Sequence, residues 1–314
     1  MGNKRVLITG ASGFIGACLA RDLAGHGDEV HLFLRSESKM WRLQGMERRF
    51  RIHNVDITDA DAVKSAVSRI EPETVYHLAT YGAYPHQKDI KLSVETNVLG
   101  TMNLVNACSG VKSFINVSSS SEYGIKTKPM KESDVLEPNS IYGITKAAST
   151  LYCLRKAQEE GMPITIFRIF AAYGYYEDQA RLIPSVIVPF LRNQSPKLSS
   201  PNSVRDFIFV EDIIDAFKKA AQTPAARGEI LNLGTGKQRT VRDVAEIARK
   251  LTGSRKEVIW GAVQKKRQEP KKWVADMSKT ARILKWKPKH TLEQGMEKTV
   301  SWFKKTGMGT DKYA

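Results

Sequence analysis

A tyrosine and a lysine, Tyr142 and Lys146, stand four residues apart in a stretch that is expected to be helical. Residues at this spacing lie on one face of a helix, one turn from each other. An ammonium group beside a phenol favours the phenolate, so this pair could let the tyrosine exchange a proton well below its reference pKa of about 10. Tyrosine and lysine at this spacing also occur by chance on helix surfaces. Taken alone, this pair could therefore be an ordinary surface pair.

Hydroxyl side chains gather upstream of this pair. The serines from Ser118 to Ser121 follow an expected strand over residues 113–117. At the end of a strand their hydroxyl groups could hydrogen-bond a substrate carbonyl. The serines and the Tyr–Lys pair together indicate a site that holds a carbonyl group and moves a proton to or from it.

A glycine cluster indicates a second kind of site. The run Thr9-Gly10-Ala11-Ser12-Gly13-Phe14-Ile15-Gly16 follows the first expected strand and opens a helix. Glycines there let backbone amides approach a pyrophosphate, and the helix N-terminus adds partial positive charge. The spacing Gly-x-x-Gly-x-x-Gly differs from the common dinucleotide fingerprint, and a plain tight turn is the alternative. The position directly after the first strand favours a dinucleotide site.

The end of the second expected strand distinguishes the two nicotinamide cofactors. This strand runs into Arg35 and Ser36. A basic residue there accommodates the 2′-phosphate of NADP, whereas NAD sites usually place an acid there. Glu37 comes too late for that role, and Lys39 and Arg42 add positive charge beside the same phosphate. NADP(H) is therefore favoured and NAD stays possible; a solvated basic loop is the alternative.

The elements that must position these residues follow from hydrophobic periodicity. Short apolar runs rich in β-branched residues alternate with helical periodicity through the first half of the chain. Strands are expected over residues 5–9, 29–34, 50–55, 74–77, 113–117 and 164–167, and helices over 13–24, 59–70, 92–108 and 142–160. This alternation predicts an α/β fold of the Rossmann type, a doubly wound parallel sheet.

The pattern changes after Arg168. Aromatic and glycine-containing sequence is followed by an expected helix over 182–192, and regular strands return at 206–210 and 229–233. This predicts a smaller, interleaved C-terminal substrate-binding lobe. The NAD(P)-binding domain is expected to cover residues 1–168 plus about 205–235, and the substrate lobe about 169–204 plus 236–314.

Composition excludes several classes of protein. The 314 residues contain no apolar run of the length that a membrane span requires. Cys18, Cys108 and Cys153 have no Cys-x-x-Cys spacing, which excludes a disulfide framework or a cysteine zinc site. We therefore expect a cytoplasmic protein with no membrane partner and no bound metal.

The charge balance indicates anionic partners. The chain carries 49 Lys and Arg against 33 Asp and Glu, a formal net charge of +16. Such a surplus fits nucleic acid, acidic lipid or a phosphorylated small substrate. No basic helix interleaved with base-stacking aromatic residues is visible, so we expect no nucleic-acid partner.

Taken in order, these motifs resemble those of the extended short-chain dehydrogenase/reductases, the family of nucleotide-sugar epimerases, dehydratases and reductases. The resemblance extends from Lys4 to about Pro288. It rests on Thr9-Gly10-x-x-Gly13-x-x-Gly16, Asp56, Tyr76-His77-Leu78-Ala79, Asn97-Val-x-Gly100-Thr, Ser119, Tyr142-x-x-x-Lys146, Arg205-Asp206-Phe207 and Asp276-x-Ser-Lys279. It implies a nucleotide-sugar substrate and a homodimer formed through the helices at 92–108 and 142–160.

The resemblance also implies roles for individual residues. Ser119 would hydrogen-bond the substrate carbonyl, Tyr142 would be the acid/base, and Lys146 would bind the cofactor ribose and lower the pKa of the tyrosine. The implied cofactor-binding residues, besides Tyr142 and Lys146, are Gly10, Ser12, Gly13, Phe14, Ile15, Gly16, Arg35, Ser36, Asp56, Ile57, Leu78, Ala79 and Thr80. The implied substrate-binding residues are Tyr81, Tyr84, Ser120, Ser121, Arg205 and Arg267.

Departures from the family pattern narrow the expected activity. Ser120 and Ser121 stand where the dehydratase branch carries acids, and Glu122 comes one place later, which argues against dehydration. The run Ala79-Thr-Tyr81-Gly82 and the basic residue at position 35 look closer to 4-ketoreductases, such as the CDP-linked paratose and abequose synthases.

The expected reaction is therefore hydride transfer from NADPH to the C4 ketone of a nucleotide-linked 4-keto-6-deoxyhexose, with Tyr142 as the proton donor. The alternative is an NAD-dependent nucleotide-sugar 4-epimerase with tightly bound NAD.

Overall fold

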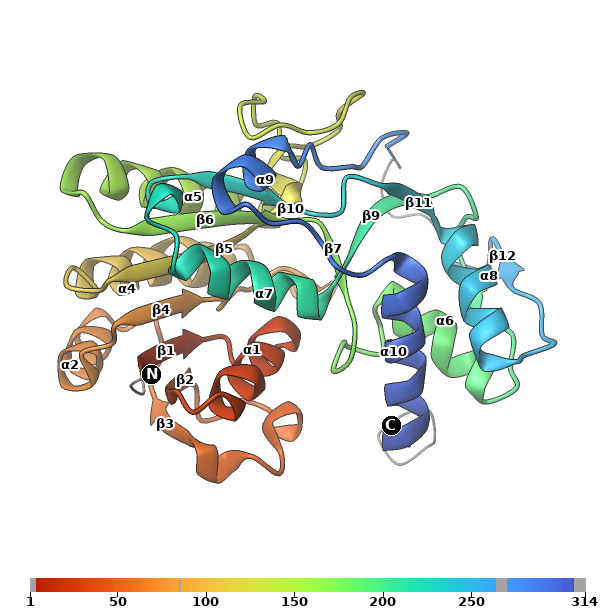
Figure 1. Ribbon diagram of the computed structural model, residues 1–314, viewed down its shortest axis with the longest axis horizontal. Coiled ribbons are helices and arrows are strands. Elements are labelled where there is room, and N and C mark those ends of the chain that lie inside the picture. The colour runs from red at the N-terminus through yellow and green to blue at the C-terminus, as the bar shows by residue number, and fades with distance from the viewer. Residues whose placement is uncertain (1–3, 85, 264–269, 308–314) are drawn as a thin grey trace.

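A seven-stranded parallel sheet forms the centre of the protein (Figure 1), in a computed structural model that describes residues 4–84, 86–263 and 270–307. The strand order is β10-β6-β5-β4-β1-β2-β3. The bounds are Arg5–Thr9 for β1, Glu29–Leu34 for β2, Phe50–Asn54 for β3, Thr74–His77 for β4, Ser113–Ser119 for β5, Ile164–Ile169 for β6 and Ile230–Leu233 for β10. The order reverses between β1 and β4, which opens a crevice at the carboxyl ends of the strands. The predicted doubly wound sheet is confirmed.

Helices cover both faces of this sheet (Figure 1). One face carries α1 (Phe14–Gly25) and α7 (Val210–Ala221), which pack against each other. The other face carries α2 (Ala60–Ile70), α4 (Gly100–Ala107) and α5 (Ile141–Glu160). Because both faces are covered, side chains on both sides of the central strands are buried; Val6, Leu7 and Ile8 of β1 are examples.

The helix expected over 92–108 is interrupted. It consists of α3 (Ile90–Val94), one π-helical turn (η3, Glu95–Leu99) and α4. Asn97 lies in the π turn and is fully buried. Single π turns of this kind occur frequently at functional sites, because the wider turn re-aims a side chain.

A second lobe is interleaved with the first. The strands β7 (Ala171–Tyr173), β9 (Val204–Phe209) and β11 (Gln238–Thr240) form a small sheet, and β8 (Lys197–Leu198) pairs with β12 (Ile259–Trp260). The helices α6 (Leu182–Leu191), α8 (Val241–Thr252) and α10 (Leu292–Thr306) pack beside this sheet, on the right of Figure 1, and α9 (Ser278–Leu284) lies against β10. The strand β9, which the sequence places with the cofactor-binding residues 205–235, pairs with β7 and β11, whereas β10 joins the main sheet.

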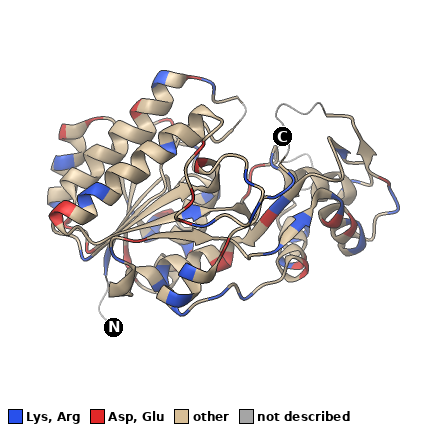
Figure 2. Ribbon diagram, turned by 90° about the horizontal axis from the view of Figure 1, so that it is seen from above, with Lys and Arg blue, Asp and Glu red and all other residues tan. Residues whose placement is uncertain are grey.

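Charged residues are spread over both lobes rather than gathered on one element (Figure 2). Many of the cations have a close acidic partner, such as Lys218 with Asp22 at 2.6 Å and Lys279 with Glu229 at 2.7 Å. Within the described ranges, no helix is long and apolar enough to cross a membrane, and no cluster of three His, Cys, Asp or Glu side chains could hold a metal ion.

Candidate active site

The three predicted catalytic residues meet at the carboxyl end of β5. Ser119 is the last residue of β5, and α5 begins nearby at Ile141, where the Ser140 hydroxyl accepts a hydrogen bond from Gly143 N at 3.1 Å. This cap places Tyr142 in the first helical turn. The Tyr142 phenol shares hydrogen bonds with the side chains of Ser119 and Thr80. The sequence-predicted serine and tyrosine are therefore in direct contact.

Lys146 lies one turn deeper along α5. Its side chain is buried, and its Nζ donates to the carbonyl oxygen of Val117 at 2.7 Å. Burial lowers the pKa of Lys146 to about 8, and the negative charge of Glu122 opposes this shift. Burial raises the pKa of Tyr142, and its hydrogen bonds to Ser119 and Thr80 oppose that shift. That Lys146 lowers the pKa of the tyrosine stays a prediction.

The glycine turn packs tightly against the end of β4. Gly10 has a φ of +71°, and a Cβ atom there would lie 2.6 Å from Ala79 N. A Cβ on Gly16 would collide with the Gly10 carbonyl oxygen. Only glycine permits this close approach at either position. Ser12, Gly13, Phe14 and Ile15 complete the turn and the start of α1, whose first-turn amides suit a pyrophosphate.

Asn97 joins this region to the catalytic helix. Its Oδ1 accepts from Thr80 Oγ1 at 3.0 Å and from Tyr81 N at 2.8 Å, while its Nδ2 donates to Thr145 Oγ1 at 2.9 Å. Thr80 thereby stands between Asn97 and the phenol of Tyr142. Sequence reasoning identified Asn97 only as a structural residue of a long helix; the π turn is what directs it toward the loop after β4.

The predicted adenosine-side residues lie near the ends of β2 and β3. Arg35 and Ser36 are exposed, and Arg35 Nε is 2.9 Å from Glu37 Oε1. Asp56 Oδ1 accepts from Thr58 N at 2.9 Å. Ile57 is buried and packs against Gly100.

The predicted position of Arg42 beside the 2′-phosphate is wrong. Arg42 does not stand there with Arg35 but is buried, with Nη1 donating to Ser12 O at 3.2 Å and Nε donating to Tyr176 O at 2.7 Å. The short 3₁₀ helix η1 (Trp41–Leu43) folds back onto α1, and this contact turns Arg42 inward.

The predicted substrate residues occupy two places. Tyr81 and Tyr84 follow β4, and Arg181 lies over the Tyr84 ring at 5.4 Å. Ser120 and Ser121 form η4 (Ser120–Glu122), where Ser121 N donates to Ser119 Oγ at 3.1 Å.

The predicted diphosphate arginines belong to the second lobe. Arg205 lies on β9, with its guanidinium 5.9 Å from the Trp273 ring. Arg267 lies outside the described residues.

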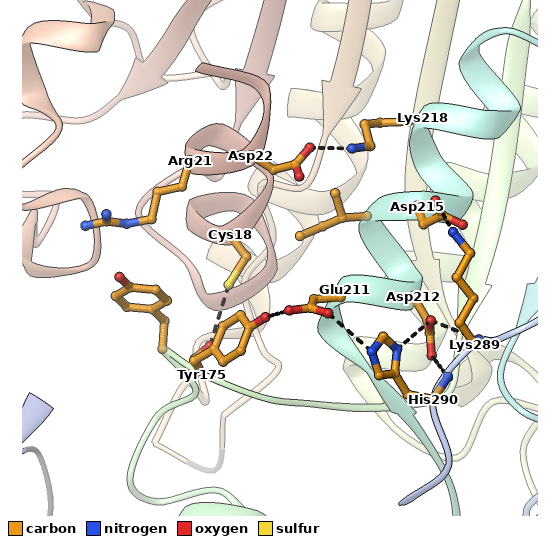
Figure 3. A pocket seen from close by; sticks show the side chains of 12 residues that line it. Cys18, Arg21, Asp22, Tyr175, Glu211, Asp212, Asp215, Lys218, Lys289 and His290 are labelled. Atoms are coloured by element: carbon orange, nitrogen blue, oxygen red, sulfur yellow. Dashed lines mark hydrogen bonds and ion pairs between the residues drawn. The ribbon is translucent and has the colours of Figure 1, made fainter. Parts of the chain in front are cut away.

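A cavity of about 340 Å³ lies elsewhere, between α1 and α7 (Figure 3). Most of its charged side chains are mutually paired: Lys218 contacts Asp22 at 2.6 Å, and His290 lies 3.0 Å from Asp212 and 3.3 Å from Glu211. Arg21 instead donates to backbone carbonyl oxygens. None of the three catalytic candidates lines it. The cavity is therefore separate from the candidate active site.

Comparison with known proteins agrees with this geometry. The family model described as "NAD dependent epimerase/dehydratase family" matches residues 6–234. The chain belongs to this family. The predicted membership of the nucleotide-sugar epimerase, dehydratase and reductase group is thereby confirmed, whereas the closer likeness to 4-ketoreductases stays a prediction.

Several relatives resemble this family member along nearly its whole length. A UDP-N-acetyl-alpha-D-glucosaminuronate decarboxylase of Bacillus cytotoxicus is 29% identical, with 96% of this chain and 98% of the relative covered. The crystal structure of a UDP-glucose 4-epimerase of Thermotoga maritima with UDP-glucose has a TM-score of 0.88 at 28% identity, covering 96% and 99% of the chains. A UDP-glucuronic acid 4-epimerase of Bacillus cereus in complex with UDP-glucuronic acid and NAD has a TM-score of 0.84 at 27% identity, covering 96% and 99%.

This family member also has a buried ion pair that sequence reasoning missed. Glu122 Oε2 lies 2.7 Å from Arg168 Nε, and neither side chain is more than 2% exposed. In the sequence, Glu122 stands out only as an acid out of register with the dehydratase pattern. An arginine inside the otherwise apolar strand β6 needs a buried anion, and Arg168 was the signal that could have revealed the pair.

Glu177 is another buried carboxyl group, in the loop after β7. It is 5% exposed, and its Oε2 has no hydrogen-bond partner among the described residues. Burial raises the pKa of Glu177 to about 8, and the positive charge of Arg181 opposes the shift. The folded protein therefore holds a proton here at neutral pH that the unfolded chain releases.

Replacing Glu177 by glutamine is expected to stabilise the protein at alkaline pH. Because the pKa of Glu177 is raised to about 8, the stability of the wild type falls as pH rises from the ordinary carboxyl pKa toward that value. Glutamine resembles the protonated carboxyl group and removes this dependence. In urea denaturation the variant should exceed the wild type by about 2–4 kcal/mol at pH 8 and by under about 1 kcal/mol at pH 5. An equal difference at both pH values would contradict this expectation.

Proposed function

We propose that the protein is a nucleotide-sugar enzyme that oxidises and reduces C4 of a hexose, with 4-epimerisation as the net reaction. The observation that carries this proposal is the hydrogen-bonded group of Ser119, Thr80 and Tyr142 beside the glycine turn, with Lys146 beneath it. The structural relatives include 4-epimerases whose titles name UDP-glucose and UDP-glucuronic acid, which supports the same substrate class here.

The residues present fit a nicotinamide dinucleotide. The pyrophosphate would lie on the first turn of α1, where Gly10 and Gly16 leave room for it, and Asp56 would stand at the adenine. The bound cofactor would supply the hydride acceptor and donor. Lys146 would hold the ribose next to Tyr142 and place a positive charge there.

Side chains of the protein transfer the proton. Ser119 would hydrogen-bond the C4 oxygen, and Tyr142 would take its proton during oxidation and return one during reduction. Ser120 and Ser121 carry no carboxyl group that could eliminate water, which disfavours dehydration. A net epimerisation requires that the same Tyr142 serve both steps.

Purified protein tests this proposal directly. It would be incubated with UDP-glucose, UDP-glucuronic acid and their dTDP- and CDP-linked counterparts, and the products would be followed by proton NMR. We expect the C4 epimer of one of these sugars to form without net change in cofactor absorbance at 340 nm. Absence of any conversion, with NAD and NADP both supplied, would overturn the assignment.

A 4-ketoreductase using NADPH is the second candidate, and Arg35 is the observation that favours it. Its side chain is about half exposed at the end of β2, where it pairs with Glu37. A guanidinium at this place can turn from that carboxylate to a 2′-phosphate. Stoichiometric loss of NADPH with a 4-keto sugar nucleotide would establish this reaction instead.

Replacing Arg35 by alanine separates the two cofactors. If Arg35 binds the 2′-phosphate, the variant should bind NADPH about tenfold more weakly and NADH within about twofold of the wild type. Arg155→Ala is the matched control, since Arg155 is likewise an exposed arginine paired with a glutamate, Glu159, but lies in the last turns of α5. Nicotinamide fluorescence would give all the dissociation constants. Equal effects on both cofactors would exclude a 2′-phosphate contact by Arg35.

The protein is further proposed to be a homodimer through the helices that flank the catalytic residues. Large apolar side chains are exposed there; they are Ile90 (58%) and Val94 (40%) on α3, Leu99 (46%) in η3, and Ile144 (49%) and Leu151 (55%) on α5. Ile144 and Leu151 are seven residues apart and therefore share one helix face. A grouped set of exposed apolar residues is typical of a protein interface.

The double variant Ile144→Glu/Leu151→Glu should be monomeric at concentrations where the wild type is a dimer, because the added carboxylates would face each other across the contact. Light scattering would give the masses. Ile52→Glu is the matched control, since Ile52 is 47% exposed on the edge strand β3. A wild type that is itself monomeric would rule out the interface.

A further inference from the structure

Glu122 stands between the catalytic strand and the catalytic helix. It closes η4, three residues after Ser119, and its carboxylate is fully buried. Its Oε1 accepts a hydrogen bond from Thr150 Oγ1 at 2.7 Å and another from Ser118 Oγ. Ser118 directly precedes the catalytic serine on β5, and Thr150 is one helical turn after Lys146 on α5. The carboxylate thus joins the two elements that carry the catalytic residues.

A rigid support holds this carboxylate in place. Arg168 Nε contacts Glu122 Oε2 at 2.7 Å, and Arg168 Nη1 donates to the carbonyl oxygen of Glu132 and to Tyr123 Oη, both at 3.1 Å. The Tyr123 hydroxyl in turn donates to Asn232 Oδ1 at 2.7 Å. Because every member is buried or half-buried and hydrogen-bonded, the network resists displacement.

The same carboxylate acts on the lysine through its charge. Among the described residues, the charged and titratable groups that act on Lys146 are Glu122, from η4, and Cys153, from α5 itself. Burial, and after it the positive charge of Lys146, lowers the pKa of His77 of β4 to about 3. Arg168 contacts the other oxygen of this carboxylate, Oε2. Glu122 is therefore the only acid from another element that acts on Lys146 within the described part of the chain.

We propose that Glu122 is a positioning residue for the reaction proposed above: through Ser118 and Thr150 it ties the strand that carries Ser119 to the helix that carries Lys146, and it places a buried negative charge between these two elements. This role rests on the proposed function, since it assigns a task to Ser119 and Lys146. It explains why an acid is present here although it stands one place away from the acids of the dehydratase pattern.

The test compares three variants. Glu122→Gln keeps the shape and removes the charge, Thr150→Val keeps the charge and removes the link to α5, and Glu132→Gln is the matched control. Glu132 is the other carboxylate of the network, and its Oε1 accepts from Asn232 N at 2.7 Å on the far side of Arg168. For each variant we would measure kcat, KM, the pH profile of kcat, and the Kd of NAD(P)H between pH 6.5 and 9.

For Glu122→Gln we expect kcat about tenfold lower with KM within about twofold, and an alkaline limb of kcat that moves to lower pH, because Lys146 loses its proton earlier. Cofactor binding should also weaken at a lower pH than in the wild type. Thr150→Val should lower kcat without moving the alkaline limb, and Glu132→Gln should change neither.

Two results would overturn the proposal. One is a folded Glu122→Gln protein with the kcat and alkaline limb of the wild type. The other, decisive if Glu122→Gln does not fold, is a Thr150→Val protein with unchanged kcat. Wild-type protein without turnover of any nucleotide sugar would refute the proposed function instead, and the pH dependence of NAD(P)H binding would still show whether Glu122 acts on Lys146.

Discussion

Replacing Tyr142 by phenylalanine is expected to lower kcat on the order of 10³-fold. The phenol contacts both Ser119 and Thr80, and in the proposed reaction it exchanges a proton with the C4 oxygen. The glycine turn and Lys146 are unchanged in the variant, so NAD(P)H should bind within about twofold of the wild type. NMR assays of reactions quenched at fixed times would give kcat, and nicotinamide fluorescence would give the Kd of NAD(P)H.

The control for this variant is Tyr152→Phe. Tyr152 lies on the same helix, but its hydroxyl donates to Asn106 Oδ1 at 2.6 Å, near the surface. It should keep the activity of the wild type. Turnover by Tyr142→Phe at the rate of the wild type would remove Tyr142 from the mechanism.

The second large effect is expected for stability. Replacing Arg168 by methionine leaves the carboxylate of Glu122, which is 0% exposed, without its cation. Breaking a buried pair in this way costs about 3–5 kcal/mol, because the remaining charge stays desolvated. Urea denaturation at pH 7, followed by tryptophan fluorescence, should show a loss of this size.

A double variant separates the pair from the packing around it. In Arg168→Met/Glu122→Gln the buried charge is gone as well, so much of the lost stability should return. A loss below about 1 kcal/mol for Arg168→Met alone would contradict this account of the pair. A double variant as unstable as the single one would show that the space left at position 168, not the unpaired charge of Glu122, causes the loss of stability.

Most of the central sheet follows from local sequence. The strands β1, β2 and β4 have the predicted bounds, because each is a short apolar run that ends at polar or glycine residues. The strand β5 extends two residues further than the predicted 113–117, to Ser119, since the register with Arg168 and Ile169 of β6 continues there. Serine side chains gave no apolar signal for those two positions.

The departures of the structure from the predicted fold have a different origin. The strand β9 pairs with β7 and β11 because of contacts between segments far apart in the chain, and periodicity does not encode the choice of partner. The π turn around Asn97 depends on hydrogen bonds to Thr80, Tyr81 and Thr145, none of which is local to the helix.

The candidate site divides in the same way. Tyr142 and Lys146 were identified from their spacing, and Ser119 from the family resemblance together with the serines that follow the predicted strand. Their catalytic roles stay predictions. Glu122 and Arg168 are 46 residues apart, and their pairing arises only when β5 and β6 lie side by side. Arg42 reaches Ser12 across 30 residues for a similar reason.

The late position of β10 in the chain bears on how the protein is made. The strand β6 pairs with β5 on one side and with β10 (Ile230–Leu233) on the other. The segment from Ala171 to Phe209, which carries β7 and β9 of the small sheet, is synthesised before β10. While the ribosome extends that segment, β6 presents an unpaired edge, which is a template for pairing with other chains. Nascent chains stopped before Ile230 should therefore be prone to aggregation and to chaperone binding, and release should follow once β10 has emerged.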